Sequence, residues 1–373
     1  MADLSLLTRL RAREDAMLAA LEDLVMTETP SDDMARIGDG VGLVSAMVDQ
    51  LLGERPETIE SQGRQHLRLR GTGDRPVLLL CHLDTVWPAG TTARWPFAVD
   101  GGRATGPGIF DMKAGLVQGL FAVSALAGRP DVTLLVTTDE EIGSPTGRAL
   151  VEEEARRSRA VLVLEPSADG ALKTVRKGIS LYRLHIGGRA AHAGLEPERG
   201  VNALTELSHQ VLRLADLADP GLGTTVTPTT ATAGSTVNTV PATAEVSIDV
   251  RASAVAEQHR VHAALGSLAP VVDGSVLRVT GAINRPPLEA RASADLMALA
   301  TRCASDLRLP QPASAAVGGA SDGNFTAALG VPTLDGLGAV GDHAHGEGEY
   351  VLTSAMPERA ALVATLIDHL LER

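Results

Sequence analysis

The sequence predicts an α/β protein with a mixed, mostly parallel sheet and an inserted ferredoxin-like α+β module. Before Lys177, strand-like and helix-like segments alternate at about thirty residues per unit, which is typical of βαβ architecture. Beyond Lys177 the pattern changes to the strict alternation of a sheet with one exposed face. The 373 residues are also too many for one average core. We therefore expect a discontinuous first domain of residues 1–176 and 287–373, and a second domain of residues 177–286.

In the first domain, leucines and alanines at helical spacing predict one helix over residues 4–26, which ends before Thr29-Pro30-Ser31. Apolar runs then predict strands at residues 67–70, 76–81, 131–137 and 160–164. Helices are expected directly after Asp111 and around residues 147–157. After the insertion we expect helices at 292–307 and 357–371, and a short strand at 333–336.

In the second domain, residues 180–186 alternate between two faces, with Tyr182, Leu184 and Ile186 on one and Arg183 and His185 on the other. Further strands are expected at residues 224–232, 244–251 and 275–280, and helices at residues 200–216 and 255–268. The resulting order, β-α-β-β-α-β, is that of a ferredoxin-like module.

Composition limits the class of protein. A hydrophobic content of 44% and a charged content of 21% are those of a soluble globular chain. The formal net charge of −13 argues against a nucleic-acid or anionic-membrane partner. The first residues carry charges in every turn and no apolar run reaches 18 residues, so we expect neither a signal peptide nor a membrane span, and a cytoplasmic location. Cys81 and Cys303 are expected to be free thiols.

Carboxylates and histidines follow the predicted strands. The set comprises His82, Asp84, Asp111, Glu140, Glu141, Glu165 and His345. The carboxyl ends of parallel strands meet at one edge of a sheet, where open α/β proteins place ligands and catalysts. Imidazoles mixed with carboxylates suit a Zn²⁺-like ion better than Ca²⁺ or Mg²⁺. The set is large enough for two ions, so the pattern predicts a two-metal hydrolase.

With these residues in place, the chain resembles the M20 family of metallopeptidases, and most closely the bacterial glutamate carboxypeptidases. The resemblance runs through essentially the whole chain, in seven motifs that occur in the family's order. They are H-L-D-T-V-W-P-A-G, G-P-G-I-F-D-M-K-A-G, T-T-D-E-E-I-G-S, L-E-P, G-R-A-A-H-A-G-L-E-P-E-R-G-V-N-A, G-G-A-S-D-G and H-A-H-G-E-G-E-Y-V. The resemblance implies a metal-binding catalytic first domain and a second domain that serves as lid and dimerisation domain.

The resemblance also implies a ligand set for two Zn²⁺ ions per chain, with Co²⁺ or Mn²⁺ as substitutes. His82 and Glu165 are expected to bind one ion, and Glu141 and His345 the other. Asp111 is expected to bridge both, because a carboxylate has two oxygens. The family also implies a cis peptide bond after Asp111.

Two further residues of the first domain, Asp84 and Glu140, have implied roles. Asp84 is expected to accept a hydrogen bond from the ligating His82 imidazole and so to hold its tautomer. Glu140 is expected to be the general base that takes a proton from the attacking water. His345, rather than His343, stands at the family's spacing before the E-Y-V segment, and His343 is expected nearby at the rim.

In the second domain, His192 of R-A-A-H-A-G is either an exposed hairpin histidine or, by the resemblance, a donor to the oxyanion in the partner subunit's site. Asn238 and Arg251 match family positions near the substrate's carboxylate. Arg285 of N-R-P matches an arginine that glutamate carboxypeptidases use for the C-terminal residue, although a hinge arginine paired with an acid remains an alternative.

The expected function is hydrolysis of an amide or peptide bond next to a free carboxylate in a small-molecule substrate, with release of C-terminal glutamate as the leading hypothesis. An amino-acid deacylase of the acetylornithine or succinyl-diaminopimelate type is the second hypothesis. The third is an inactive binding protein on the same scaffold, which would be expected to lack Glu140 or a ligand, and none is missing.

Overall fold

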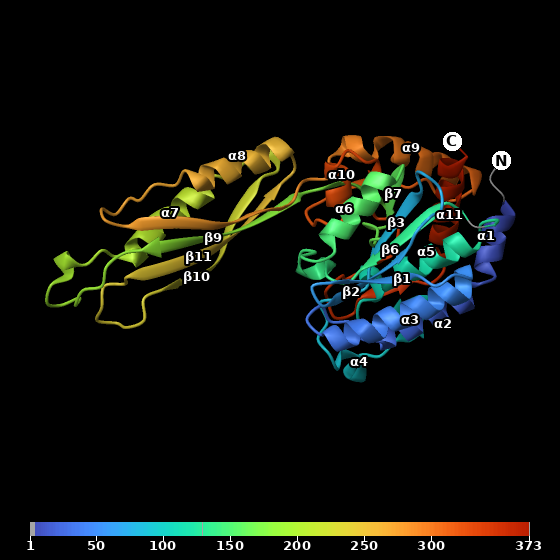
Figure 1. Cartoon of the computed structure of the whole chain (residues 1–373), viewed down its shortest axis with the longest axis horizontal. Helices are drawn as coiled ribbons and strands as arrows, with labels where there is room; N and C mark the ends of the chain where they lie inside the picture. Colours follow the sequence, from blue (N-terminus) through green and yellow to red (C-terminus); the bar gives the residue numbers. More distant parts are fainter. Residues whose placement is uncertain (1–3, 129, 373) are drawn as a thin grey trace. The chain divides into compact units, whose positions relative to one another are not determined.

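The computed structural model describes residues 4–128 and 130–372, which form two compact units (Figure 1). The first unit contains the chain up to Val175 together with Glu289–Val317 and the residues from Ser321 onward. The second unit contains Arg176–Leu288 and Gly318–Ala320.

A six-stranded sheet forms the centre of the first unit, in the order β1-β2-β6-β3-β7-β14. Its strands are β1 (Glu57–Ser61), β2 (Arg64–Leu69), β3 (Val77–His82), β6 (Val132–Thr137), β7 (Ala160–Val163) and β14 (Thr333–Leu334). β6, β3, β7 and β14 run parallel, and β2 and β1 add an antiparallel edge. The predicted mixed, mostly parallel α/β sheet is therefore confirmed.

Helices cover both faces of this sheet (Figure 1). Along β3, Val77 and Leu79 pack into one apolar cluster, whereas Leu78 and Leu80 pack into another on the opposite face. The first cluster includes residues of α1 (Leu4–Arg11), α2 (Glu14–Met26), α3 (Met34–Leu52), α5 (Ala114–Ser124), α9 (Ala290–Asp306) and α11 (Ala355–Leu371). The second includes residues of α6 (Arg148–Arg157) and α10 (Gly323–Ala328). Burial on both faces explains why the parallel strands are continuous apolar runs.

The N-terminal region differs from the prediction. The expected single helix over residues 4–26 is wrong, because α1 and α2 are separate helices: α1 packs against α11, whereas α2 packs against α5. Helix α3 and strand β1 were not predicted, whereas the strand expected at residues 67–70 corresponds to the second half of β2. Glycines at 38, 40 and 42 weaken the helical signal of α3. Gly40 is required there by close packing, since a Cβ would lie 2.5 Å from the Thr29 side chain.

A small antiparallel sheet joins two distant segments of the first unit, in the order β15-β16-β5-β4. Its strands are β4 (Ala98–Asp100), β5 (Arg103–Thr105), β15 (Gly341–Asp342) and β16 (Tyr350–Leu352). Tyr350 pairs with Thr105, so the chain that follows β5 lies beside the chain that precedes β16. Further elements are a two-stranded sheet of β8 (Leu172–Arg176) and β13 (Ser314–Val317) and the short helix α4 (Thr91–Arg94).

The second unit has the predicted β-α-β-β-α-β order. Its elements are β9 (Gly178–Gly187), α7 (Ala203–Ala215), β10 (Thr225–Ala233), β11 (Thr243–Ala252), α8 (Val255–Gly266) and β12 (Val276–Arg285). The sheet is antiparallel throughout, in the order β10-β11-β9-β12. Tyr182, Leu184 and Ile186 are buried in a cluster with residues of both helices, and Arg183 and His185 lie on the other face, as the alternation predicts.

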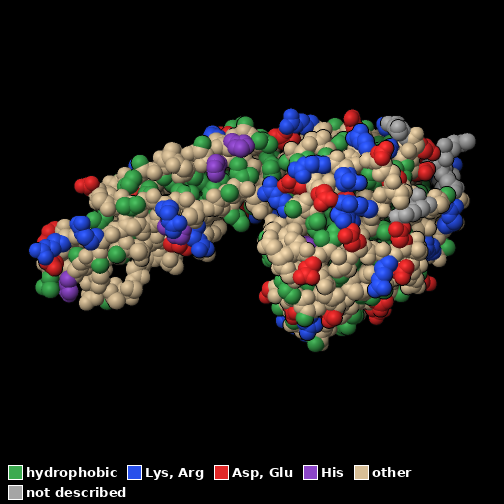
Figure 2. All heavy atoms as spheres, viewed as in Figure 1, with side chains coloured by type: hydrophobic (Ala, Val, Ile, Leu, Met, Phe, Trp, Pro, Cys, Tyr) green, Lys and Arg blue, Asp and Glu red, His purple; other side chains and the backbone are tan. Residues whose placement is uncertain are grey.

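No helix within residues 4–128 and 130–372 is long and apolar enough to cross a membrane. On the face seen in Figure 2, acidic and basic side chains are interspersed over the first unit and form no extended basic patch.

Candidate metal centre

The five predicted metal ligands come together at the carboxyl edge of the six-stranded sheet. His82 is the last residue of β3, Glu165 follows β7, and Glu141 lies in a 3-10 turn, Glu140–Ile142, after β6. Asp111 lies at a kink within the segment Ile109–Lys113, where Asp111 and Met112 have non-helical backbone angles, and the peptide bond from Asp111 to Met112 is cis, as predicted. His345 comes from the loop between β15 and β16.

The His82 imidazole is oriented as a metal ligand. Its Nδ1 lies 3.0 Å from the carbonyl oxygen of Asp84, an acceptor, so Nδ1 carries the proton in the neutral ring. Nε2 then presents a lone pair, and it lies 3.2 Å from Asp111 Oδ1 and 3.5 Å from Glu165 Oε1. A cation bound between this lone pair and the two carboxylate oxygens would stabilise the arrangement.

His345 makes the second half of the cluster. Its Nε2 lies 3.3 Å from Asp111 Oδ2 and 3.1 Å from Glu141 Oε1. The two oxygens of Asp111 thus face different imidazoles, as a bridging ligand requires. Hydrogen bonds to Asp111 and Glu141 raise the pKa of His345 to about 10. The same negative charge that holds a proton here attracts a divalent cation.

The donor set fits two divalent ions. His82, Asp111 and Glu141 offer ligand atoms within 4.8 Å of one another, and so do His82, Glu140 and Glu165. The four carboxylates, when ionised, carry a charge of −4, which two divalent cations would neutralise. Nitrogen and oxygen donors together suit Zn²⁺. Glu140 is 9% exposed and lies in the same turn as Glu141, but only Glu141 contacts His345.

Asp84 holds the turn that carries both glutamates. The carboxylate of this fully buried residue accepts hydrogen bonds from the backbone N–H groups of Glu140 at 3.1 Å and Glu141 at 3.2 Å, and from the Ser31 hydroxyl at 2.7 Å. Its Oδ1 lies 3.6 Å from His82 Nδ1, farther than the Asp84 carbonyl oxygen. The carbonyl therefore orients the imidazole, and the carboxylate fixes the glutamate turn to the end of β3.

A second buried carboxylate supports the same turn from another side. Asp322 accepts a hydrogen bond from Thr137 at 3.0 Å, before the turn, and another from Ser144, after it. No role was expected for Asp322, although it lies in the G-G-A-S-D-G motif. An acidic residue between small residues signals a turn, not a buried acceptor, so the pattern alone did not reveal this contact.

The predicted residues of the second unit form two separate groups. His192 and Asn238 lie on adjacent segments, because the Ala193 N–H donates to the Asn238 carbonyl oxygen and His192 bridges to Thr239. Arg251 and Arg285 both lie opposite Ile179, at the other end of the sheet. His192 is exposed, whereas Arg285 is 4% exposed.

Arg251 already has a carboxylate partner. Its Nε and one terminal nitrogen lie 2.8 and 2.9 Å from the two oxygens of Asp249, two residues earlier on β11. Such a bidentate pair holds the guanidinium plane in place.

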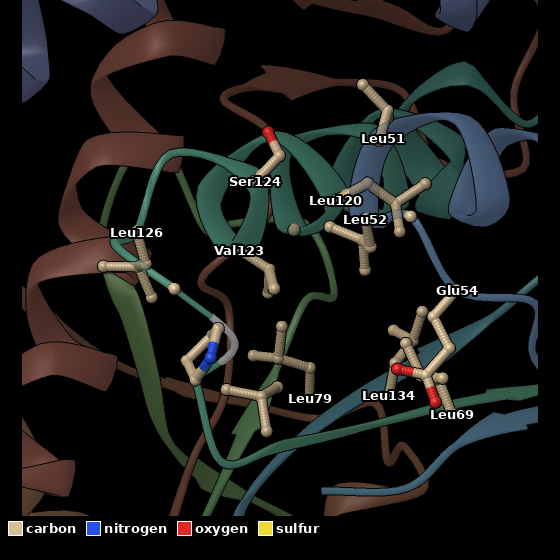
Figure 3. A pocket seen from close by; sticks show the side chains of 15 residues that line it. Leu51, Leu52, Glu54, Leu69, Leu79, Leu120, Val123, Ser124, Leu126 and Leu134 are labelled. Carbon is tan, nitrogen blue, oxygen red and sulfur yellow. The ribbon is translucent and has the colours of Figure 1, made fainter.

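A pocket lined largely by leucines lies away from this chemistry (Figure 3). It has a volume of about 230 Å³ and is lined by leucines such as Leu52, Leu79 and Leu120, with Glu54 as its one carboxylate. It includes none of the predicted site residues, so it is not the catalytic centre.

Comparisons with known proteins agree with this site. The model of peptidase family M20/M25/M40 matches residues 78–369. Carboxypeptidase G2 of Pseudomonas sp. (strain RS-16) is 32% identical over 379 residues, which covers 95% of this chain and 89% of that protein. Succinyl-diaminopimelate desuccinylase of Alkalilimnicola ehrlichii is 29% identical over 319 residues, covering 78% of this chain and 82% of that protein.

Solved structures show the same fold at lower identity. Aminopeptidase PepT from Bacillus cereus superposes with a TM-score of 0.73 at 18% identity, covering 96% of this chain and 98% of that one. The M20 family metallo-carboxypeptidase Sso-CP2 from Sulfolobus solfataricus gives a TM-score of 0.70 at 15% identity, covering 94% and 98%. The chain is therefore an enzyme of peptidase family M20/M25/M40, a family of metal-dependent hydrolases that act on small peptides or acyl amino acids.

Proposed function

We propose that this protein is a dinuclear zinc carboxypeptidase that hydrolyses the amide bond next to a free carboxylate and releases C-terminal glutamate. The observation that carries the proposal is the two-oxygen arrangement of Asp111, each oxygen facing one imidazole. Together with Glu141 and Glu165 this set would hold two ions. The similarity to carboxypeptidase G2 along 95% of the chain supports cleavage at a C-terminal residue.

Different residues of the chain have different roles in the proposed hydrolysis. Bound divalent ions would supply Lewis acidity toward the scissile carbonyl and lower the pKa of the attacking water. Glu140, held by its backbone to Asp84, accepts a proton from that water and delivers it to the departing amine. Asp84 and Asp322 keep the Glu140–Glu141 turn in place, so proton transfer and ligation depend on the same buried contacts.

A homodimer in which second-unit residues act on the partner's centre is part of this proposal. From Ile179, at its arginine end, to Gly187 the strand β9 spans about 26 Å, and His192 lies beyond it. A dipeptide or tripeptide spans only about 7–10 Å. One subunit's Arg251 and His192 therefore cannot both contact a single small substrate, and a two-fold partner would provide the missing group. Because Asn238 lies beside His192, it would act together with His192.

An acyl amino acid hydrolase is the second candidate. The similarity to a succinyl-diaminopimelate desuccinylase over 78% of this chain and to an acetylornithine deacetylase over 43% favours it. The same centre serves both reactions, since each breaks an amide bond beside a carboxylate. The two candidates differ in the side chain that the substrate-binding residues accept.

A substrate panel separates these candidates. N-acylglutamates and short peptides ending in glutamate would be compared with N-acetylornithine and N-succinyl-diaminopimelate by measuring amine release after loading with Zn²⁺. The proposal expects the highest kcat/KM for glutamate at the C-terminus, two ions per chain by elemental analysis, and loss of activity on chelation.

Two substitutions assign the adjacent glutamates. Glu140→Gln should keep both ions and lose about 10²–10⁴ in kcat, the usual size of a general-base contribution. Glu141→Gln should instead weaken one metal site. Normal turnover by Glu140→Gln would overturn the assignment of the base.

A further inference from the structure

Glu349 is a fully buried carboxylate that no assigned role explains. It lies four residues after His345 and immediately before β16, and its side chain is 0% exposed. Neither imidazole of the metal centre contacts it. The burial of a carboxylate that contacts neither metal ion nor substrate needs another explanation, because burial disfavours its charge and raises its pKa.

The surroundings of Glu349 consist of hydrogen-bond donors. Oε1 accepts from the backbone N–H groups of Phe110 at 2.8 Å and Asp111 at 2.9 Å. Oε2 accepts from the backbone N–H of Gly108 at 3.0 Å and from Trp87 Nε1 at 2.9 Å. Each oxygen therefore receives two donors, an arrangement that only the ionised carboxylate satisfies in full.

The chain that contacts Glu349 is the segment that presents the bridging ligand. Three of the four donors belong to residues 108–111, which end at Asp111 itself. The β5–β16 pairing brings this segment within reach, because Tyr350 lies opposite Thr105 and the two chains continue side by side beyond that pair. The position of the Asp111 backbone thus depends directly on one side chain.

Glu349 is also tied to the second imidazole. Between them the chain makes two successive turns, in which the Gly346 N–H donates to the His343 carbonyl oxygen at 2.8 Å and the Glu349 N–H donates to the Gly346 carbonyl oxygen at 3.1 Å. His345 has a positive φ of 62° within this compact loop. A change at Glu349 would therefore affect both the bridging carboxylate and the histidine that faces its Oδ2.

We infer that Glu349 is a positioning residue that sets the distance between Asp111 and His345, and so couples the two halves of the metal centre. This inference rests on the proposed dinuclear function. It assigns to Glu349 no contact with substrate or ion. Its consequence is that loss of the carboxylate weakens metal binding while leaving the recognition of substrate largely unchanged.

The test compares Glu349→Gln with Glu347→Gln. Glu347 is two residues away in the same loop, and its side chain is 80% exposed, with Arg94 at 4.0 Å, so it controls for loss of a negative charge. The Glu349→Gln substitution keeps the size of the side chain but directs an NH₂ group at backbone donors. Zn²⁺ affinity would be measured by competition with a chromophoric chelator, on folded protein well below the unfolding temperature.

We expect Glu349→Gln to lose about 10–100-fold in Zn²⁺ affinity, the usual effect of removing a partner of a metal ligand. When saturated with Zn²⁺ it should show a lower kcat with little change in KM. Glu347→Gln should match the wild type in both. The fluorescence of the metal-free protein should also change in Glu349→Gln, because Trp87 is one of only two tryptophans and donates to Glu349.

Several outcomes decide the matter. Wild-type Zn²⁺ affinity in a folded Glu349→Gln protein overturns the inference, and so does a reduced melting temperature with unchanged affinity, which would mark a purely structural role. If Glu349→Gln does not fold, Glu349→Asp replaces it: the charge remains, the oxygens withdraw by one methylene, and the affinity should fall by several-fold. Wild-type affinity in Glu349→Asp then overturns the inference. Failure of the wild type itself to bind two ions would instead refute the proposed function.

Discussion

The substitution Asp84→Asn tests whether one buried carboxylate aligns the end of β3 with the glutamate turn. Asp84 Oδ1 accepts from the Glu140 N–H, and Oδ2 accepts from the Glu141 N–H and the Ser31 hydroxyl. An asparagine has one oxygen and one NH₂ group. Whichever way the amide is turned, its NH₂ group therefore meets a backbone N–H of the turn, while the Ser31 hydroxyl can rotate to accept.

The cost in stability follows from the number of hydrogen bonds that the substitution removes. At least one charge-assisted hydrogen bond is lost and one buried N–H is left without an acceptor, which together cost about 2–4 kcal/mol. For a domain of about 150–250 residues, a loss of about 2–4 kcal/mol lowers the melting temperature by about 4–16 °C. The displaced turn should also reduce metal affinity by about 10–100-fold.

The assay is thermal unfolding of the metal-free protein, followed by Zn²⁺ titration against a chromophoric chelator. Asp32→Asn is the matched control, since Asp32 is exposed and adjacent to Ser31. It should leave both quantities unchanged. If Asp84→Asn has the melting temperature and the Zn²⁺ affinity of the wild type, the reasoning about this contact is wrong.

Three further predictions follow from packing, burial and symmetry. Gly115→Ala should destabilise the protein by about 1–3 kcal/mol, because the new Cβ would lie 2.0 Å from the Leu164 carbonyl oxygen. Gly42→Ala, with no atom within 4 Å of the new Cβ, should instead stabilise α3 by about 0.5–1 kcal/mol, and chemical denaturation measures both changes. Both cysteines are buried with raised thiol pKa values, so a thiol reagent at pH 8 should label neither in the folded protein and both in denaturant. Co-assembly of the His192→Ala and Glu140→Gln chains should restore about a quarter of wild-type activity, since about half of the dimers would be mixed and each mixed dimer would have one intact site. Heterodimers as inactive as the two parents would show that His192 acts in its own subunit's site or in none.

The sheet and the clustering of the candidate metal ligands could be predicted because each depends on a local signal. A parallel strand buried on both faces is a continuous apolar run, and β3, β6 and β7 were recognised on that basis. The polar residue that follows such a run lies at the carboxyl edge of the sheet, independently of the other elements of the fold. His82 and Glu165 therefore come together from strands that are adjacent in space but far apart in sequence.

Helix α3 was missed for the opposite reason. Its glycines at positions 38, 40 and 42 oppose a helical reading, and only its packing explains them. A Cβ on Gly40 would clash with the Thr29 side chain, so the glycine is there to allow a close contact between distant segments. Helix propensity describes one residue at a time and contains no information about such a neighbour.

Asp322, Glu349 and the contact of Asp84 with the glutamate turn were missed because these roles depend on tertiary contacts, whereas Asp84 itself was expected to support His82. A ligand is recognised by its chemical type and its place at a strand end. A supporting carboxylate is recognised only by the donors around it, which are mainly backbone N–H groups for Asp84 and Glu349 and hydroxyls for Asp322. Asp84, Asp322 and Glu349 share this property: each bonds to the loop or turn that carries a ligand. The three carboxylates carry further negative charge close to the ligand set, and each offsets the cost of its burial through the donors that surround it. Metal binding and the stability of these loops are therefore linked, and a substitution at any of the three should change the metal affinity of a protein whose ligands are all intact.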